Sequence, residues 1–113
     1  MLGDELFVSS YQRISVFSLA GQRLRHWGCE GDADGQFNYP QALCAAGGYI
    51  YVADSWNQRV QVFTPAGEFV SKFGSEGLSK ETRPGYFYWP CGLCWHAGRL
   101  YVSDASSRIQ VFE

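Results

Sequence analysis

The feature that most constrains this fold is a passage that occurs three times in the chain. The stretch IYVADSWNQRVQVF at residues 50–63 returns as LYVSDASSRIQVF at 100–112, and more faintly as LFVSSYQRISVF at 6–17. Two other blocks repeat in step, since GQFNYPQALCAAGG at 35–48 matches GYFYWPCGLCWHAG at 85–98, and GQRLRHWG at 21–28 matches GEFVSKFG at 67–74. Copies about 44 to 50 residues apart predict a repeat architecture in which each unit packs against its neighbours.

The repeated blocks have the character of short β-strands. RVQVF and RIQVF alternate polar with apolar residues, and IYVAD and LYVSD are runs of β-branched and aromatic residues that end in an aspartate. Glycine-containing turns separate the blocks, and no stretch keeps a helical apolar spacing for long. We expect an all-β protein whose complete unit has strands near 39–45, 49–54, 59–64 and 68–73. Four antiparallel strands per unit is typical of a β-propeller blade.

The order of these motifs resembles the NHL repeat. DGQFNYPQAL is followed by IYVADSWNQRVQVF and then by GEFVSKFG, and the resemblance extends over almost the whole chain. It implies a ring of about six blades, of which this chain would supply an incomplete arc of about ten strands. We expect one domain over 1–113, with a partial blade at 5–28, a complete blade at 36–74 and a partial blade at 86–113. The end blades would expose apolar faces, so we expect self-association or flanking blades to complete the ring.

Composition excludes several classes of protein. The 113 residues are 17% aromatic and carry a formal net charge of −2 with no basic run, which does not favour nucleic acid as the default partner. No stretch approaches the 18 apolar residues of a membrane-spanning helix, and the N-terminus does not resemble a secretory signal. The expected location is cytoplasmic, without membrane association.

The motif WPCGLCWH at 89–96 suggests a redox or metal site, but the repeats favour another interpretation. Cys94 aligns with Cys44, whereas Cys91 aligns with Gln41. Cys91 and Cys94 are three residues apart, so on one strand their side chains would leave opposite faces. We expect Cys44 and Cys94 to be small, buried core residues, and replacement of Cys94 by serine to cost on the order of 1–3 kcal/mol.

Other polar residues receive structural assignments. Asp54 and Asp104 end the second strands, and Arg59 and Arg108 open the third strands, so we expect each Asp to bond the turn and to pair with the Arg across the hairpin. Ser10 takes the Asp position in the first copy. The only histidines, His26 and His96, fall in different parts of the repeat, and the acidic stretch Glu30, Asp32 and Asp34 lacks the spacing of a calcium loop. We expect no metal and no cofactor, and a solvated linker at the acidic stretch.

One surface carries the functional expectation. In a propeller, the turns between second and third strands open on the same face as the connections between blades. Trp56 in such a polar turn is hard to explain by packing, and aromatic and amide side chains on a rigid rim suit protein recognition. Tyr39 and Trp89, each before a proline, are expected in the core between blades. The predicted binding residues of the rim are Tyr11, Gln12, Trp56, Asn57, Gln58, Ser106 and Ser107.

These observations favour a non-catalytic scaffold that binds a protein partner through its loop face. The NHL resemblance implies a context, because such propellers often form the substrate-receptor part of ubiquitin-ligase proteins, although this chain has no RING-type cysteine and histidine set. Two alternatives stay open. One is an RNA-binding NHL module that uses Arg13, Arg59, Arg83 and Arg108. The other is a piece of a calcium-dependent propeller hydrolase or lyase.

Overall fold

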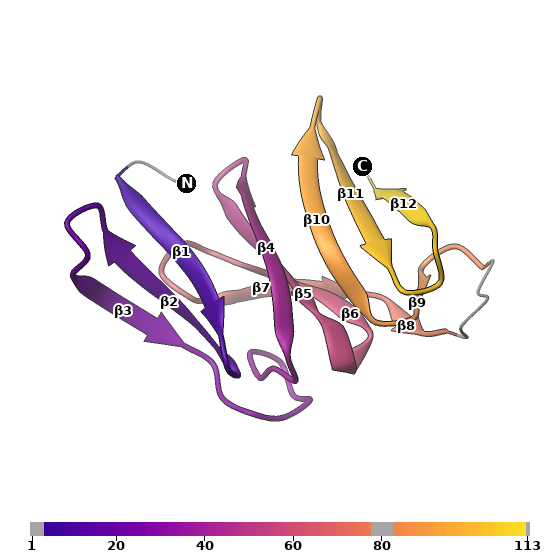
Figure 1. Cartoon of the computed structure of the whole chain (residues 1–113), viewed down its shortest axis with the longest axis horizontal. Helices are drawn as coiled ribbons and strands as arrows, with labels where there is room; N and C mark the ends of the chain where they lie inside the picture. Colours follow the sequence, from indigo (N-terminus) through magenta and orange to yellow (C-terminus); the bar gives the residue numbers. More distant parts are fainter. Residues whose placement is uncertain (1–3, 78–82, 113) are drawn as a thin grey trace.

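The computed structural model describes residues 4–77 and 83–112 and shows three antiparallel sheets (Figure 1). The first blade contains β1 (Glu5–Ser10), β2 (Arg13–Ser18) and β3 (Arg23–Trp27). The middle blade contains β4 (Pro40–Ala46), β5 (Tyr49–Asp54), the 3₁₀ turn η1 (Ser55–Asn57), β6 (Arg59–Phe63) and β7 (Phe69–Phe73). The last blade contains β10 (Pro90–His96), β11 (Arg99–Asp104) and β12 (Ile109–Phe112). Residues 1–3, 78–82 and 113 of the expected domain lie outside the described residues.

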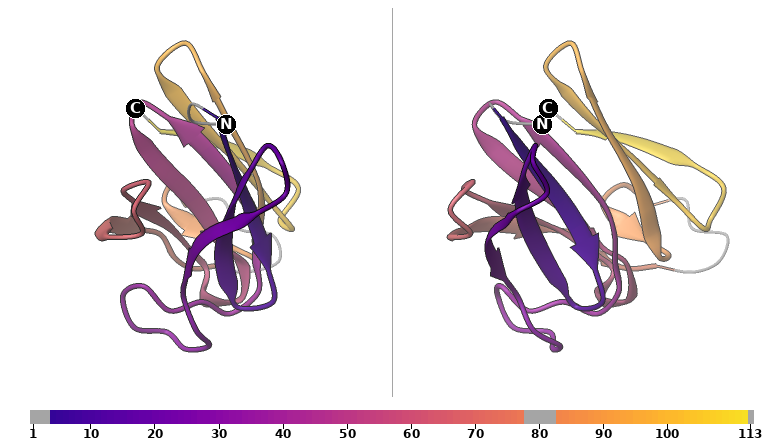
Figure 2. Two further views of the ribbon diagram at one scale, coloured as in Figure 1. Left: turned by 90° about the vertical axis from the view of Figure 1, so that its left-hand side faces the viewer. Right: turned by 60° about the vertical axis from the view of Figure 1, so that its left-hand side comes forward.

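The middle blade has the architecture that its sequence predicts. Its strands follow the order β4-β5-β6-β7, each antiparallel to the next, and their bounds agree with the expected ranges to within one residue at each end. The all-β fold class and the four-stranded blade are therefore confirmed. The three sheets stand beside one another in a fan, with the first blade at the left and the last at the right of Figure 1. Figure 2 shows from two further directions that the connection after β3 lies at the lower end of this fan.

Burial along equivalent strands depends on whether a neighbouring blade covers them. Every residue of β6 is buried, including the two polar ones, because the middle blade has a blade against each face. The residue that follows the arginine in each repeat shows this most clearly: Ile14 and Val60 are 0% exposed, whereas Ile109 is 67% exposed. The polar-apolar alternation of RVQVF therefore does not mark a solvent-facing side. It separates an apolar contact face from a buried polar one.

Aromatic side chains fill the two spaces between blades. Phe37 and Phe87 occupy equivalent positions and are both 0% exposed, and each packs with rings from the strands on either side. Phe37 lies 5.6 Å from Phe63 between ring centroids, and Phe87 lies 5.9 Å from Phe112. Such tilted ring pairs stabilise the contact beyond the burial of their area.

A glycine at the end of each outermost strand makes room for these rings. Gly28 and Gly74 have φ values of 103° and 118°, and a Cβ atom would lie 2.5 Å from the Phe37 ring at the first position and 2.6 Å from the Phe87 ring at the second. No other residue combines this backbone conformation with this approach. The repeated aromatic-glycine pair of the sequence thus sets the spacing between blades.

Candidate recognition surface

The connections named in the sequence analysis meet at one end of the fan, the loop face. This face contains the β1–β2, β5–β6 and β11–β12 turns, together with the chain segments that lead into β4 and β10 (lower edge of Figure 1). The segments are tied to the turns by backbone bonds, since Trp56 N donates to Asn38 O at 3.0 Å and Ala105 N donates to Tyr88 O at 2.8 Å. Each bond joins the segment that leads into a blade to a turn of that same blade, so Asn38 lies beside Trp56 and Tyr88 beside Ala105.

The predicted rim residues divide into exposed and buried sets. Tyr11 is 78% exposed and Trp56 is 50% exposed, as expected for residues that contact a partner. Ser107 is exposed, and Asn57 and Ser106 are half-buried. Gln12 and Gln58, however, are only 5% and 8% exposed. Their expected place on an accessible rim is corrected, because both amides point into the contact between blades.

The two glutamines fasten each blade to the next. Gln12 Oε1 accepts a hydrogen bond from Tyr39 N at 2.6 Å, and Gln58 Oε1 accepts one from Trp89 N, also at 2.6 Å. Tyr39 and Trp89 have φ values of 59° and 54°, a left-handed conformation that costs a non-glycine residue about 1–2 kcal/mol. The glutamine bonds offset this cost and fix the direction in which both aromatic side chains leave the backbone.

Four aromatic side chains of the loop face form a continuous row. Ring centroids lie 4.4 Å apart for Tyr39 and Trp56, 6.2 Å for Trp56 and Trp89, and 5.0 Å for Trp89 and Tyr88. The last two pairs are stacked, with interplanar angles of 15° and 13°. Tyr39, Trp56, Trp89 and Tyr88 are called the aromatic row below.

The aromatic row is open to solvent. Tyr39, Trp56 and Trp89 are 45%, 50% and 44% exposed. The expectation that Tyr39 and Trp89 lie in the core between blades is wrong, because the preceding phenylalanines fill that space. Tyr39 and Trp89 each have a positive φ and lie between a buried phenylalanine and a buried proline, and this backbone conformation projects their side chains outward.

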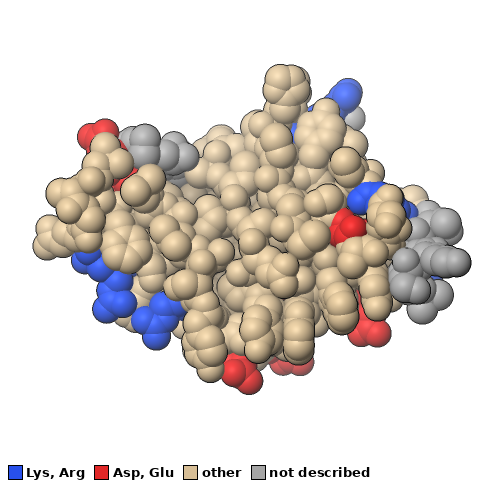
Figure 3. All heavy atoms as spheres, viewed as in Figure 1, with Lys and Arg blue, Asp and Glu red and all other residues tan. Residues whose placement is uncertain are grey.

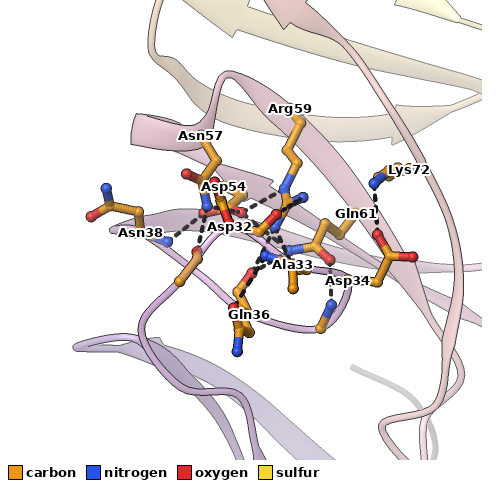
Figure 4. A network of polar contacts seen from close by, with 12 residues as sticks. Asp32, Ala33, Asp34, Gln36, Asn38, Asp54, Asn57, Arg59, Gln61 and Lys72 are labelled. Atoms are coloured by element: carbon orange, nitrogen blue, oxygen red, sulfur yellow. Dashed lines mark hydrogen bonds and ion pairs between the residues drawn. The ribbon is translucent and has the colours of Figure 1, made fainter.

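Asp54 is the centre of a buried polar network in the middle blade (Figure 4). Its Oδ2 accepts from Arg59 Nε at 2.8 Å, and its Oδ1 accepts from Asn38 N at 2.7 Å. Asn57 Nδ2 and Gln61 Nε2 also donate to Oδ2, at 2.9 and 3.1 Å. The Asp54 side chain is 0% exposed and that of Arg59 is 8% exposed, so the predicted pair across the hairpin is present and buried.

Arg59 and its neighbours also hold the linker between the first two blades. The Arg59 guanidinium donates to the carbonyl oxygens of Asp32, Ala33 and Gln36 at 2.8 to 3.0 Å. Asn57 Nδ2 donates to Gly31 O at 2.8 Å. The acidic linker is thus bonded to the blade through its backbone while Glu30, Asp32 and Asp34 remain exposed, Asp34 in a surface ion pair with Lys72 at 2.7 Å.

The last blade does not reproduce the predicted Asp-Arg pair. Asp104 accepts instead from Ser106 N at 3.0 Å, from the Ser106 hydroxyl and from Tyr88 N at 3.0 Å. The ion pairs of the described residues do not include Asp104 with Arg108. Arg108 donates to the carbonyls of Arg83 and Tyr86, both at 2.6 Å, and its Nε has no hydrogen-bond partner. The turn is one residue shorter here, which brings a serine hydroxyl within reach of the aspartate.

Cys44 and Cys94 are less buried than the sequence suggested. Cys44 and Cys94 line a cavity of about 410 Å³ between β1, β4 and β10, together with Leu6, Phe7, Leu43, Ala45, Leu93 and Trp95. Cys44 is half-buried, and burial raises the pKa of its thiol, but Cys94 is exposed, so its expected place in the core is wrong. Cys91 falls where the β10–β11 register shifts and is also exposed. All four cysteines are free thiols.

The described residues also bear on metal and membrane binding. No group of three or more His, Cys, Asp or Glu residues within 4–77 and 83–112 is placed to hold a metal ion. In the same ranges no helix has the length and apolar character needed to cross a bilayer.

Positive charge on the loop face is largely engaged in the structure itself. The guanidinium groups of Arg59 and Arg108 donate to backbone carbonyls, and Arg83 lies over the Tyr86 ring at 3.9 Å. Figure 3 shows acidic atoms along the lower edge of the molecule, whereas the largest group of basic atoms lies at the left, over the first blade, and smaller ones lie at the right. Three of the four arginines considered for RNA therefore have structural partners.

Comparison with a solved structure defines the class of protein. BamB from Moraxella catarrhalis superposes on the chain with a TM-score of 0.70 at 20% sequence identity, over 100% of this chain and 30% of that one. Similarity at this level of identity shows the fold, and the chain consists of β-propeller blades.

Sequence comparison gives the family. Residues 37–63 match the NHL repeat, and the chain belongs to the NHL-repeat propellers. It is 42% identical over 79 residues to RING finger protein nhl-1 of Caenorhabditis elegans, 37% over 70 residues to the peptidylglycine alpha-amidating monooxygenase of Rattus norvegicus, and 49% over 47 residues to the E3 ubiquitin-protein ligase TRIM71 of Xenopus tropicalis. These alignments cover 69%, 58% and 41% of this chain, but only 8%, 7% and 6% of the relatives.

Proposed function

We propose that the chain is a non-catalytic scaffold that binds a protein partner through its loop face. The observation that carries this proposal is the aromatic row, whose exposed rings are held in place by buried hydrogen bonds from two blades. Rigid, exposed aromatic side chains lose little conformational entropy on binding and are enriched where interfaces gain most of their affinity. Asn57 and Ser106 of this face hydrogen-bond within the fold, and Gln12 and Gln58 bond the next blade.

The names of two relatives support a finer version of the proposal. RING finger protein nhl-1 and the E3 ligase TRIM71 are each matched over a small part of their length. We propose that the chain serves as the substrate-receiving part of a larger ligase-type protein, in the cytoplasm. RNA is the competing ligand, but the engagement of Arg59, Arg83 and Arg108 within the fold does not favour it.

Selection from a displayed peptide library tests the general proposal. We expect enriched peptides to bind the chain, to lose binding when Trp56 or Trp89 is replaced by alanine, and to tolerate Tyr49→Ala. Tyr49 is a matched control, since it is 42% exposed and is the first residue of β5, at the opposite end of the blade from the β5–β6 turn. Peptides that bind all three variants equally would refute recognition by the loop face.

The ligase context needs a separate test. In a reconstituted reaction with the full-length protein that carries this chain, a partner bound by the loop face should receive ubiquitin. Trp56→Ala should abolish transfer to the partner while self-ubiquitylation persists. Equal ubiquitin transfer to the partner by the parent protein and by Trp56→Ala would refute the receptor role and leave the binding proposal standing.

A further inference from the structure

We propose that the aromatic row, together with the carboxylates of the two linkers beside it, binds an arginine or lysine side chain in an extended segment of the partner protein. This inference rests on the proposed function and adds the chemistry of the ligand. A cation over the face of an aromatic ring is attracted by the ring's quadrupole, and tryptophan is the strongest such partner. The row offers two tryptophans and two tyrosines side by side.

The arrangement of the rings suits a side chain that lies across their exposed faces. Trp56 and Trp89 are nearly parallel, at 15°, with centroids 6.2 Å apart. They belong to consecutive blades, so one contact would bridge the middle blade and the last. Backbone bonds to Asn38 O and Gln58 Oε1 fix the positions of Trp56 and Trp89. A partner would therefore meet a surface that is already ordered, which reduces the entropic cost of binding.

Acidic residues recur at equivalent places beside the row. Glu30 pairs in parallel with Phe37, two residues before Tyr39, and Glu76 of β8 (Ser75–Glu76) pairs in parallel with Phe87 of β9 (Tyr86–Phe87), two residues before Trp89. Both glutamates are exposed. Asp32, also exposed, lies in the linker whose carbonyls bond Arg59 and Asn57. The segments that lead into the middle and the last blade thus each pair with an exposed glutamate, two residues before their exposed aromatic residue.

The same arrangement discriminates between ligands. Carboxylates next to aromatic rings stabilise a bound ammonium or guanidinium group and repel phosphate. The charge of Arg59 is paired with Asp54, and both Arg59 and Arg108 use N–H groups on backbone carbonyls of the linkers, where they do not bond a phosphate. Figure 3 shows acidic atoms at the lower edge of the molecule, whereas the larger group of basic atoms lies over the first blade. A basic protein segment fits this face better than a nucleic acid does.

Labelled synthetic peptides provide the test, with fluorescence anisotropy on the full chain. The probe is a peptide of alternating arginine and threonine, which in an extended conformation presents all its arginines on one side. The control peptide has citrulline, a neutral side chain of the same shape, in place of arginine. We expect the arginine peptide to bind about tenfold more tightly than the citrulline peptide, and more weakly as salt rises. Equal affinities would overturn the inference.

Variants of the chain test the contribution of the aromatic rings to binding separately from that of the carboxylates. Trp56→Leu keeps apolar area but removes the π face, and we expect it to lower the affinity for arginine about tenfold, whereas Tyr49→Ala should not change it. The double variant Glu30→Gln, Glu76→Gln should weaken binding severalfold and flatten its salt dependence. Glu68→Gln, in the turn at the opposite end of the blade, is the matched control. Unchanged binding by Trp56→Leu or by the double glutamine variant would overturn the inference.

The result also distinguishes this inference from the proposed function. Peptides selected from the library that depend on Trp56 but bind as well after their basic residues are replaced would leave protein recognition standing and refute the basic ligand. If a single-stranded oligouridine binds the aromatic row and the arginine peptide does not bind, both the proposed function and the basic ligand are refuted in favour of RNA. Enrichment of arginine and lysine in Trp56-dependent peptides would support both.

Discussion

The turns between the second and third strands of the middle and last blades each begin with an equivalent aspartate but form different hydrogen-bond networks. Asp54 lies five residues before Arg59 and forms a buried ion pair with it, whereas Asp104 lies four residues before Arg108 and bonds Ser106 instead. The residue before each arginine also differs. Gln58 bonds the following blade, while Ser107 is exposed. The comparison indicates that the longer turn serves a contact between blades, and that the shorter one bonds only within its own blade.

The largest expected difference concerns the two aspartates. Asp54→Ala would leave the buried Arg59 guanidinium without its carboxylate, so we expect a loss of about 3–5 kcal/mol in the free energy of unfolding. Asp104→Ala removes hydrogen bonds from a turn without an ion pair, and about 1–2 kcal/mol is expected. Urea titration followed by circular dichroism measures both values. Equal losses would show that the Arg59 pair contributes nothing particular to the middle blade.

The apolar position after each arginine should show the next largest contrast. Val60 is 0% exposed beneath Phe87, and its replacement by alanine is expected to cost about 2 kcal/mol. Ile109 is 67% exposed, so Ile109→Ala should change the free energy of unfolding by less than about 0.5 kcal/mol.

The same position tests the expected self-association. If the uncovered face of the last blade holds copies together, Ile109→Ser should lower the apparent mass measured by sedimentation at high protein concentration, while the sedimentation of Ser107→Ala stays that of the parent chain. An Ile109→Ser protein that sediments like the parent at every concentration would show that this face does not mediate association.

The glutamine contact should give a smaller but local effect. Gln58→Ala leaves Trp89 N without its acceptor, and we expect about 1–2 kcal/mol of destabilisation with faster hydrogen exchange at the Trp89 amide. Ser107→Ala, at the corresponding turn position of the last blade, should be nearly neutral. Protection of the Trp89 amide that survives Gln58→Ala would mean that another group positions this ring.

Much of the fold could be predicted because the same strand and turn pattern occurs in several copies along the chain. The strand order, the middle-blade bounds and the Asp54–Arg59 pair all follow from blocks that recur in step. The aromatic row was only partly predictable. Trp56 stood out as an aromatic residue in a polar turn, but Tyr39 and Trp89 were assigned to the core, since sequence spacing does not reveal the left-handed φ that turns them outward.

Other errors have a common physical origin. Gln12 and Gln58 lie in turns, and turn amides are usually solvated, so nothing local showed that the next blade would cover them. The alignment with Cys44 predicts a buried Cys94, yet the two differ in exposure because β4 lies between β1 and β10, whereas β10 has a blade on one side only. Burial in a repeat protein depends on what covers the unit, and one unit's sequence does not contain that information.

The smallest predicted difference concerns the reactivity of these two cysteines. Burial raises the pKa of the Cys44 thiol, so at pH 8 a smaller fraction is thiolate than for an ordinary cysteine, and the thiolate is the form that attacks an alkylating reagent. Cys94 is exposed at the corresponding position. We expect iodoacetamide to modify Cys94 several times faster than Cys44, with the gap narrowing as pH rises through the pKa of Cys44. Mass spectrometry of timed digests measures both rates, and Cys29 and Cys91 serve as exposed references. A Cys44 that reacts as fast as Cys94 throughout would show that the cavity between β1, β4 and β10 does not shield it.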